Sequence, residues 1–434
     1  MIKTSLRRGW RDRQTLRYGV TPAHSVLFGP LDSATESFLT LLDGTRALPT
    51  LRDAAAALGL GRDAADRLAA RLAAAGVLED ATAEREAVAR VGERLRPDLA
   101  ALSLLHREPG AGVRRLAERR SAWVQVRGAG RVGAAIASAL AQAGVGRVEV
   151  VDGGRVTPAD LGPGGLRAEH LGSRRAQAVT SLVREGRPWP RGTEEERREG
   201  ARLVIFAPRD GLLAYAPDPA VAEPVLAAGT PHLYAGVVEA TGFVGPLVLP
   251  GRTACAGCLL RERARREPGW PLLVGQWRNA ADRGVPACDG PLAGAVAGLA
   301  ACAALAFLDA SAPPGPSART EIALPGLSVT SHPIPPHPDC PCGAEAASRA
   351  AEAERAAAAA PDTEAEHAAE AARAAGGRKS AGAPAGARRV AEAGGRAREF
   401  RRGAPVRRPG PARRAGSPGR GPGARPGGRE RPMA

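Results

Sequence analysis

The sequence predicts an α/β protein whose main domain is a doubly wound sheet, preceded by a small α+β domain and followed by a disordered tail. Three observations support this prediction. A glycine-rich turn joins a strand to a helix near residue 130, strands and helices alternate after it, and the composition changes sharply from Gly343 onward. The predicted boundaries are 1–80 for the small domain, 81–120 for a helical connector, 121–342 for the main domain and 343–434 for the tail.

The main domain is predicted from the stretch VQVRGAGRVGAAIASALAQAGVGRVEVVD, residues 124–152. Strand-type residues lead into Gly128, Gly130 and Gly133, an alanine-rich helix follows, and a second strand ends at Asp152. In a Rossmann-like fold these glycines permit, in order, a tight turn, the approach of a phosphate to the backbone, and close packing of helix and strand. The carboxylate of Asp152 is then placed to bind a ribose. The stretch therefore predicts a nucleotide site, and the alternative is a glycine-rich turn that serves packing alone.

Residues 1–80 alternate short strand patterns with helical ones. The strand patterns lie at 14–18 and 25–28, and the helical patterns at 33–42, 51–58 and 63–75. Three helices with flanking strands predict a winged-helix-like fold. A DNA-reading helix needs basic and polar side chains toward the groove, but these helices are mostly alanine and leucine with balanced charge. The pattern favours protein or peptide docking, with a purely structural appendage and DNA binding as the alternatives.

Beyond Asp152, strands are expected at 203–207, 233–237 and 244–249 and a helix at 218–228, which predicts a mainly parallel sheet. The tail is too rich in Ala, Gly, Pro and Arg to bury a core, although a frayed helix is allowed at 344–375. Residues 371–434 hold 17 of the 61 basic residues and 3 of the 45 acidic ones, so the rest of the chain is nearly neutral. The pI of about 10.9 therefore does not indicate a nucleic-acid groove in the folded part. Non-specific attraction of polyanions to the tail and a plain solvated segment are the two interpretations of this region.

Four of the six cysteines form two close pairs. Cys255 and Cys258 make a Cys-x-x-Cys pattern, and Cys340 and Cys342 make a Cys-x-Cys pattern. In a reducing compartment clustered thiolates are metal ligands rather than disulfides, and four of them close a tetrahedral, structural zinc site. Only the fold can join the two pairs, which lie far apart in the sequence. The nearby His337 is the alternative for one ligand position.

The segment 290–312 is long and apolar, which raises the question of a membrane span. It is rich in Ala and Gly and follows a charged segment, so we expect a buried helix, with Cys302 packed in the core. The N-terminal stretch MIKTSLRRGWRDRQ lacks the apolar centre of a signal peptide. We therefore expect a cytoplasmic protein that does not bind membranes.

Residues 115–342 resemble the ThiF, MoeB and ubiquitin-activating-enzyme superfamily. The motifs that carry this resemblance are GAGRVG at 128–133, LAQAGVGRVEVVD at 140–152, VTPADL at 156–161, GSRRA at 172–176 and VLPGRTACAGC at 248–258. The resemblance implies that the glycines and the strand-end acid bind ATP with magnesium. It also implies adenylation of the carboxyl terminus of a small protein or peptide, a four-cysteine zinc site that braces the fold, and a homodimer.

The catalytic pattern of that superfamily is incomplete in this chain. Its N-L-x-R-Q arginine is missing, because residues 160–164 read DLGPG, and Arg167 is a candidate to replace it. Its G-x-x-K lysine is Arg175, which keeps the charge but changes the geometry. The superfamily also has an aspartate in a later D-N pair. Asp210 is displaced from that position by one residue and is a candidate magnesium ligand. Cys288 is a candidate nucleophile, which would need a pKa lowered by a cation or a helix N-terminus.

The N-terminal domain resembles the PqqD-type peptide-recognition fold through LDGTRALPTLRDAAAAL at 42–58 and LAAAGVLED at 72–80. Such domains bind leader peptides by adding them as an extra strand at a sheet edge beside a helix. Together the domains resemble the ThiF-like partner proteins of thiazole- and oxazole-forming peptide pathways, which deliver a precursor's leader peptide to a YcaO-type cyclodehydratase and have often lost ATP chemistry. We therefore expect a peptide-delivery protein with a degenerate nucleotide site. The alternatives are an active ATP-dependent adenylyltransferase and a DNA-binding regulator.

Overall fold

The computed structural model describes residues 1–61, 63–189, 201–279, 285–310 and 317–359. Most of the predicted tail, residues 360–434, lies outside the described residues. Its beginning forms the helix α14 (Ala344–Ala359), at the position of the expected frayed helix. An ion pair between Arg349 and Glu345, one turn apart, supports this alanine-rich helix.

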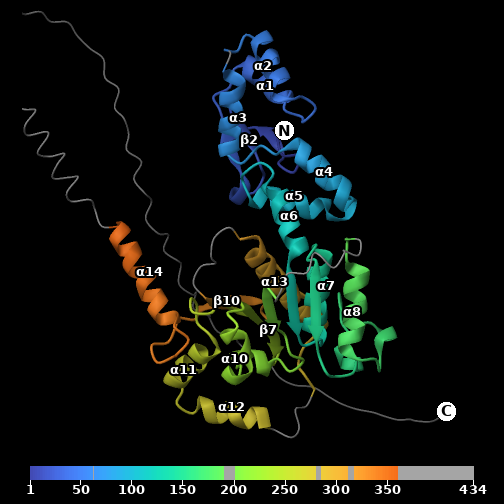
Figure 1. The fold of residues 1–434 in the computed structure, drawn as a ribbon, viewed down its shortest axis with the longest axis vertical. Helices are drawn as coiled ribbons and strands as arrows, with labels where there is room; N and C mark the ends of the chain where they lie inside the picture. Colours follow the sequence, from blue (N-terminus) through green and yellow to red (C-terminus); the bar gives the residue numbers. More distant parts are fainter. Residues whose placement is uncertain (62, 190–200, 280–284, 311–316, 360–434) are drawn as a thin grey trace, which may run out of the picture. The chain divides into compact units, whose positions relative to one another are not determined.

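Residues 1–80 form a three-stranded antiparallel sheet that shares one apolar core with three helices (Figure 1). The elements are β1 (Arg8–Trp10), β2 (Leu16–Tyr18), β3 (Val26–Phe28), α1 (Ser33–Thr40), α2 (Leu48–Ala57) and α3 (Ala64–Ala74). Asp32 caps α1 by accepting the Thr35 N–H at 2.7 Å. Sequence patterns predicted these elements except β1, which is only three residues long and exposed. An isolated antiparallel bridge joins Ile2 and Leu78, close to the two ends of this domain.

Residues 81–121 form three helices with an apolar cluster of their own. The helices are α4 (Ala81–Val91), α5 (Arg96–Leu105) and α6 (Ala111–Ser121). Leu95, Leu99, Leu102 and Leu116 are buried together with Trp189. The predicted charged connector is therefore a packed helical layer, because its leucines recur at helical spacing and face inward.

The main sheet has seven strands in the order β10-β9-β8-β7-β6-β4-β5. They are β4 (Trp123–Arg127), β5 (Arg147–Val151), β6 (Leu203–Phe206), β7 (His232–Val238), β8 (Thr241–Val248), β9 (Ala318–Ala323) and β10 (Ser328–Pro333). Strands β4 to β7 are parallel, as predicted, whereas β8, β9 and β10 are antiparallel. The sheet is therefore mixed. A two-residue turn at Glu239 and Ala240, with φ of 48° and 57°, reverses the chain between β7 and β8.

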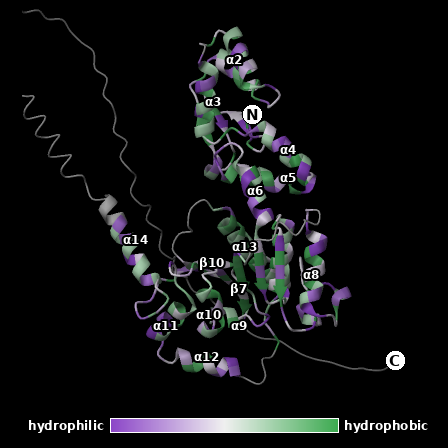
Figure 2. Ribbon diagram, viewed as in Figure 1, coloured by the Kyte–Doolittle hydropathy of each residue, from purple (hydrophilic) through white to green (hydrophobic). Residues whose placement is uncertain are grey.

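Both faces of this sheet are covered, which confirms the doubly wound prediction. Helices α7 (Arg131–Gln142), α8 (Arg175–Gly186) and α13 (Gly290–Asp309) pack on one face, and α9 (Leu212–Tyr215), α10 (Pro219–Ala227) and α11 (Ala256–Arg266) on the other. Alternate residues of the strands separate the two cores. Ile205 and Leu233 belong to the first, whereas Phe206 and Tyr234 belong to the second. The hydrophobic colouring of Figure 2 gathers on these central strands and on α13.

Helix α13 has the length and hydropathy of a membrane span, but it packs inside the domain. Nine of its residues are buried, among them Val296, Ala300 and Ala304. A Cβ on Gly242 of β8 would lie 2.4 Å from the Val296 side chain, so helix and strand are in close contact. The expectation that Cys302 packs in the core is wrong, because its side chain is exposed. Cys302 lies two residues from both Ala300 and Ala304, about 200° around the helix from the buried face.

Candidate functional site

Two positions of the turn between β4 and α7 require glycine, because a side chain there would collide with the backbone. Gly128 has φ of +110°, and a Cβ there would lie 2.1 Å from the carbonyl oxygen of Ala207. A Cβ on Gly133 would lie 2.1 Å from the carbonyl oxygen of Gly128. Gly130 differs, since Arg209 lies 3.2 Å from the place its Cβ would take. The backbone and the first side-chain carbons of Arg209 thus pack against the glycine that was expected to face a phosphate.

Asp152 directly follows β5, at the predicted end of this strand, and its carboxylate accepts donors from three residues. It accepts the N–H groups of Ala129 at 2.9 Å and Gly154 at 2.7 Å. The guanidinium of Arg175 donates to it at 2.9 Å. The exposed fractions of the Asp152 and Arg175 side chains are 7% and 14%. Gly154 makes room for this contact, because a Cβ there would lie 2.1 Å from the Arg175 guanidinium.

The contacts continue into a chain of four alternating charges, Asp152, Arg175, Asp160 and Arg209, which we call the ion-pair chain. Asp160 lies 3.6 Å from Arg175 and 2.6 Å from Arg209, and its side chain is 1% exposed. Thr157 donates its N–H and its hydroxyl to Asp160 at 2.9 and 2.8 Å. The ion-pair chain carries no net charge. It connects two predicted site residues, Asp152 and Arg175, to two residues without a predicted role, Asp160 and Arg209.

Both carboxylates of the ion-pair chain stay ionised. Burial alone would raise the pKa of Asp152, but hydrogen bonds from Arg175, Gly154 and Ala129 hold this pKa below its usual value. Burial would likewise raise the pKa of Asp160, but hydrogen bonds from Arg209 and Thr157 lower it. The positive charges of Arg175 and Arg209 are therefore balanced within the protein.

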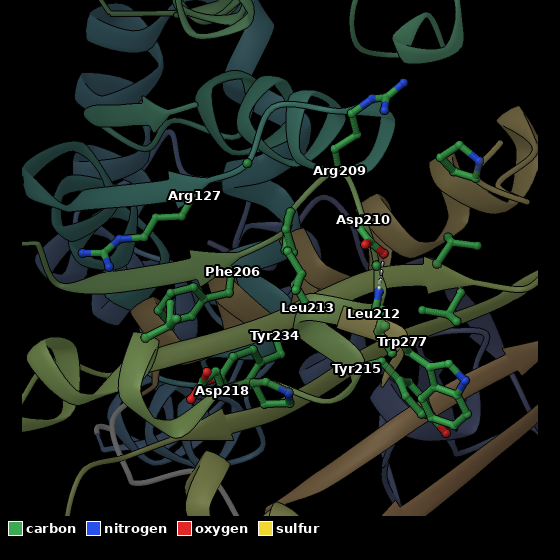
Figure 3. A pocket seen from close by; sticks show the side chains of 18 of the residues that line it. Arg127, Phe206, Arg209, Asp210, Leu212, Leu213, Tyr215, Asp218, Tyr234 and Trp277 are labelled. Carbon is green, nitrogen blue, oxygen red and sulfur yellow. Dashed lines mark hydrogen bonds between the residues drawn. The ribbon is translucent and has the colours of Figure 1, made fainter. Parts of the chain in front are cut away.

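The other predicted catalytic residues are placed differently. Arg167 is 53% exposed and pairs with Glu169 at 2.8 Å and Glu185 at 3.3 Å, and it does not line the cavity described below. Asp210 does line that cavity, and its Oδ1 accepts the Leu212 N–H at 3.1 Å (Figure 3).

Cys288 lies just before α13, as expected, but its surroundings do not activate a thiol. Burial raises the pKa of Cys288, with Arg131 opposing this effect and Asp289 adding to it. Asp289 also caps α13 by accepting the Leu292 N–H at 2.7 Å. The helix N-terminus is therefore satisfied by a carboxylate rather than offered to the thiolate.

A cavity of about 1110 Å³ opens at the carboxyl ends of β4 to β7. This is the switch point of the sheet, where the chain leaves β4 for β5 on one side and later returns to β6 on the other, and such crevices bind ligands in α/β folds. Its lining includes Gly128, Asp152 and Arg175. Aromatic side chains, among them Phe206, Tyr234 and Trp277, line it as well (Figure 3). Phe206 and Tyr234 stack there with ring centroids 5.2 Å apart.

The four predicted cysteines converge between α11 and the loop that precedes α14. Their Sγ atoms lie within 4.8 Å of one another, with 3.9 Å for Cys255 to Cys258 and 3.6 Å for both Cys255 to Cys340 and Cys258 to Cys342. A tetrahedral ion with metal–sulfur bonds of about 2.3 Å needs sulfur separations of about 3.8 Å, whereas a disulfide needs about 2.05 Å. The four cysteines can therefore hold a metal ion.

The surroundings shift the pKa values of these cysteines in opposite directions. The hydrogen bond from Cys255 lowers the pKa of Cys258 and raises that of Cys255, and burial raises the pKa of Cys342 to about 11. The guanidinium of Arg261 lies 3.8 Å from the Cys340 sulfur. His337 is not part of this four-cysteine cluster. Its side chain is 12% exposed, and its Nδ1 accepts the Asp339 N–H at 3.2 Å, which shapes the loop that carries Cys340.

Comparisons with known proteins agree with this geometry. The ThiF family profile matches residues 107–342, whereas no curated protein matches the sequence. Among solved structures, the chain is similar to MccB of E. coli with ATP (TM-score 0.56, 14% identity, 79% of this chain and 98% of MccB covered). It is also similar to the microcin C7 biosynthetic enzyme MccB in complex with N-formylated MccA (0.57, 14%, 79% and 99%), and to PaaA (0.56, 16%, 77% and 100%). The covered share exceeds residues 107–342, so the likeness of fold extends beyond them. The family match over more than half of its length shows that this chain belongs to the ThiF family.

Proposed function

We propose that this ThiF-family protein binds the leader of a precursor peptide through residues 1–80 and delivers it to a YcaO-type cyclodehydratase, without using ATP itself. The observation that carries the proposal is the ion-pair chain, which fills the binding positions that an adenylating enzyme would offer to a nucleotide. The shared fold with MccB, a microcin C7 biosynthetic enzyme solved with MccA, supports a ThiF-family role in peptide modification.

The peptide would dock on β3, which pairs only with β2 within the residues that the structure describes. Helix α3 lies beside this edge, because the Arg71 guanidinium is 4.8 Å from the centre of the Phe28 ring. Leu27 of β3 is 51% exposed and is free to contact an added strand. A strand edge next to a helix is the geometry by which a peptide extends a sheet.

The same domain offers little to DNA on its helices. Arg52 of α2 is paired with Asp66 at 2.9 Å, and Arg67 of α3 with Asp63 at 3.7 Å. A recognition helix needs unpaired basic or amide side chains facing the groove. Peptide docking is therefore the better-supported function of residues 1–80.

ATP could use the glycine turn only after the contacts around it rearrange. A ribose would have to share Asp152 with the three donors that it already accepts, and a phosphate at Gly130 would meet Arg209, which packs against this glycine. Releasing Arg175 would leave two buried carboxylates with fewer partners, and breaking a buried pair costs on the order of 3–5 kcal/mol. We infer that the glycine turn now serves as scaffold. We further propose that Cys255, Cys258, Cys340 and Cys342 hold a structural zinc ion, since four thiolates leave no open position for catalysis.

The alternative is an adenylyltransferase that activates a peptide or small-protein carboxylate. The cavity at the switch point and the position of Asp210 in its wall favour it. MccB, which shares the fold, has been solved with ATP. In this case substrate binding would have to rearrange the ion-pair chain.

One experiment separates the two functions. The full-length protein is mixed with ATP, magnesium and the precursor peptide encoded beside its gene, and peptide affinity and pyrophosphate release are measured together. We expect tight peptide binding without pyrophosphate release, and unchanged binding by Asp152→Ala. Leu27→Asp should weaken binding at least roughly tenfold, whereas Leu327→Asp, at a leucine that is 67% exposed in the β9–β10 turn, should not. Peptide-dependent release that Asp152→Ala abolishes would overturn the proposal in favour of the enzyme.

A further inference from the structure

The segment 7–13, which contains the first strand of the N-terminal domain, carries four arginines and one acid. Arg7, Arg8, Arg11 and Arg13 are all exposed, and within the described part of the chain none of them has an acidic partner at ion-pair distance. The one acid among them, Asp12, instead accepts the Gln14 N–H at 2.9 Å. These four arginines, which we call the arginine edge, contrast with the paired arginines of α2 and α3.

One arginine of the arginine edge, Arg8, lies on a free strand edge, and Arg7 and Arg11 directly flank this strand. Strand β1 pairs with β2 through Arg8–Tyr18, Gly9–Arg17 and Trp10–Leu16, and the described residues place no strand on its other side. All three residues of β1 are exposed. Such a row of unpaired backbone groups is a template for another extended chain. It lies at the opposite edge of the sheet from β3, so the two edges are separate sites.

Side-chain alternation specifies what the edge would accept. Arg8 and Trp10 point to the same face, two residues apart, and Trp10 is 44% exposed. Residues directly opposite each other in a sheet have neighbouring side chains, and opposite charges or apolar pairs stabilise them. A matching strand therefore carries an acid opposite Arg8 and an apolar residue opposite Trp10, with one residue between them.

We infer that β1 binds an acidic, extended segment of the precursor peptide, in which acidic and apolar residues alternate with a spacing of two. The inference rests on the proposed peptide-binding function and adds a second contact to the β3 edge. A nucleic acid would also be attracted to the arginines, but it could not pair with the backbone groups of β1. The basic tail of the protein itself is excluded by its charge.

The test uses the full-length protein and the fluorescent peptide SETLTETLS, with analogues in which Gln or Lys replaces Glu, and a single-stranded DNA of equal length. Anisotropy gives the affinity of each. The variant Arg8→Glu/Arg11→Glu is compared with Arg94→Glu/Arg96→Glu, which makes the same change of charge at exposed arginines of the connector. Trp10 is the only tryptophan before Trp123, so Trp10→Phe shows whether a change in emission comes from β1.

We expect the acidic peptide to bind, with roughly tenfold weaker binding after reversal of Arg8 and Arg11 and little change in the connector variant. Binding should also shift the emission of the native protein to shorter wavelength, and Trp10→Phe should remove this shift. Equal binding of the Gln analogue, or equal loss in both reversal variants, would overturn the inference while leaving peptide docking at β3 intact. Tighter binding of the DNA would identify a polyanion surface instead. If Leu27→Asp abolishes binding of both the acidic probe and the native precursor, while the Arg8→Glu/Arg11→Glu variant binds both normally, β3 is the single site.

Discussion

Replacing Arg175 with alanine should destabilise the main domain by about 3 kcal/mol. Arg175 contacts Asp152 and Asp160, whose side chains are 7% and 1% exposed. Removing one partner of a buried ion pair costs about 3–5 kcal/mol, because a charge is left desolvated. The lower end applies here, since Asp152 keeps two backbone donors and Asp160 keeps Arg209 and Thr157.

The loss of stability caused by Arg175→Ala should depend on pH in a defined direction. The native pKa of Asp152 lies below its usual value, so the unfolded state binds more protons on acidification. This contribution is present above the unfolded pKa of about 4 and is lost as the pH falls through the native pKa. Without Arg175, burial opposes the two remaining backbone hydrogen bonds, and the pKa of Asp152 rises. The difference in unfolding free energy between the native protein and Arg175→Ala should therefore be largest near pH 7 and shrink at strongly acidic pH.

Urea unfolding followed by tryptophan emission measures this difference. Four of the five tryptophans lie in the main domain or pack beside it, so the signal reports mainly on that domain. A loss of about 3 kcal/mol corresponds to a midpoint shift of about 1 M or more at ordinary denaturant slopes. Arg174→Ala removes the neighbouring exposed arginine and should change stability by less than about 0.5 kcal/mol. If both variants unfold at the same urea concentration at neutral pH, Arg175 does not hold the two carboxylates as described.

Two further predictions concern the scaffold. Gly133→Ala should destabilise the protein by at least about 1–3 kcal/mol in thermal unfolding, because the added Cβ would meet the Gly128 carbonyl oxygen at 2.1 Å; Gly298→Ala, at a helical glycine with nothing within 4 Å, should be neutral or stabilising. Cys258→Ser should abolish the roughly one equivalent of zinc per chain that we expect by elemental analysis, whereas Cys302→Ser should retain it, and equal zinc content in both would show that the ion is bound elsewhere.

Local patterns predicted those parts of the structure that depend on neighbouring residues. The turn at Gly128, the helix after it and the position of Asp152 follow from strand, turn and helix signals within one short stretch. The antiparallel direction of β8, β9 and β10 was harder to predict from the sequence. Glu239 and Ala240 adopt the positive φ values of a hairpin turn without the Asn-Gly signal that usually reveals one. The exposure of Cys302 was missed for a similar reason, because α13 is apolar on both faces and its sequence does not mark the buried one.

The ion-pair chain could not be predicted, because its contacts join residues that are distant in the sequence. Arg209 and Asp160 lie 49 positions apart, and Arg175 and Asp152 lie 23 apart. The motif VTPADL does contain the acid, but nothing in the sequence shows that an arginine after β6 reaches it. The convergence of the cysteines was predictable only because thiolates at metal-ligand spacing have few other uses in a reducing compartment.

The glycine turn by itself does not distinguish an enzyme from a scaffold. Gly128 and Gly133 are required by backbone contacts at 2.1 Å that exist whether or not a nucleotide binds. A protein that lost ATP chemistry would keep both glycines, since replacing either one would push the loop away from β6 or α7 away from the loop. Only Gly130 and Asp152 report on the ligand, and in this structure an arginine contacts each of them: Arg209 packs against Gly130, and Arg175 donates to Asp152. The ion-pair chain, rather than the glycine pattern, is therefore the feature by which ATP use in this protein should be judged.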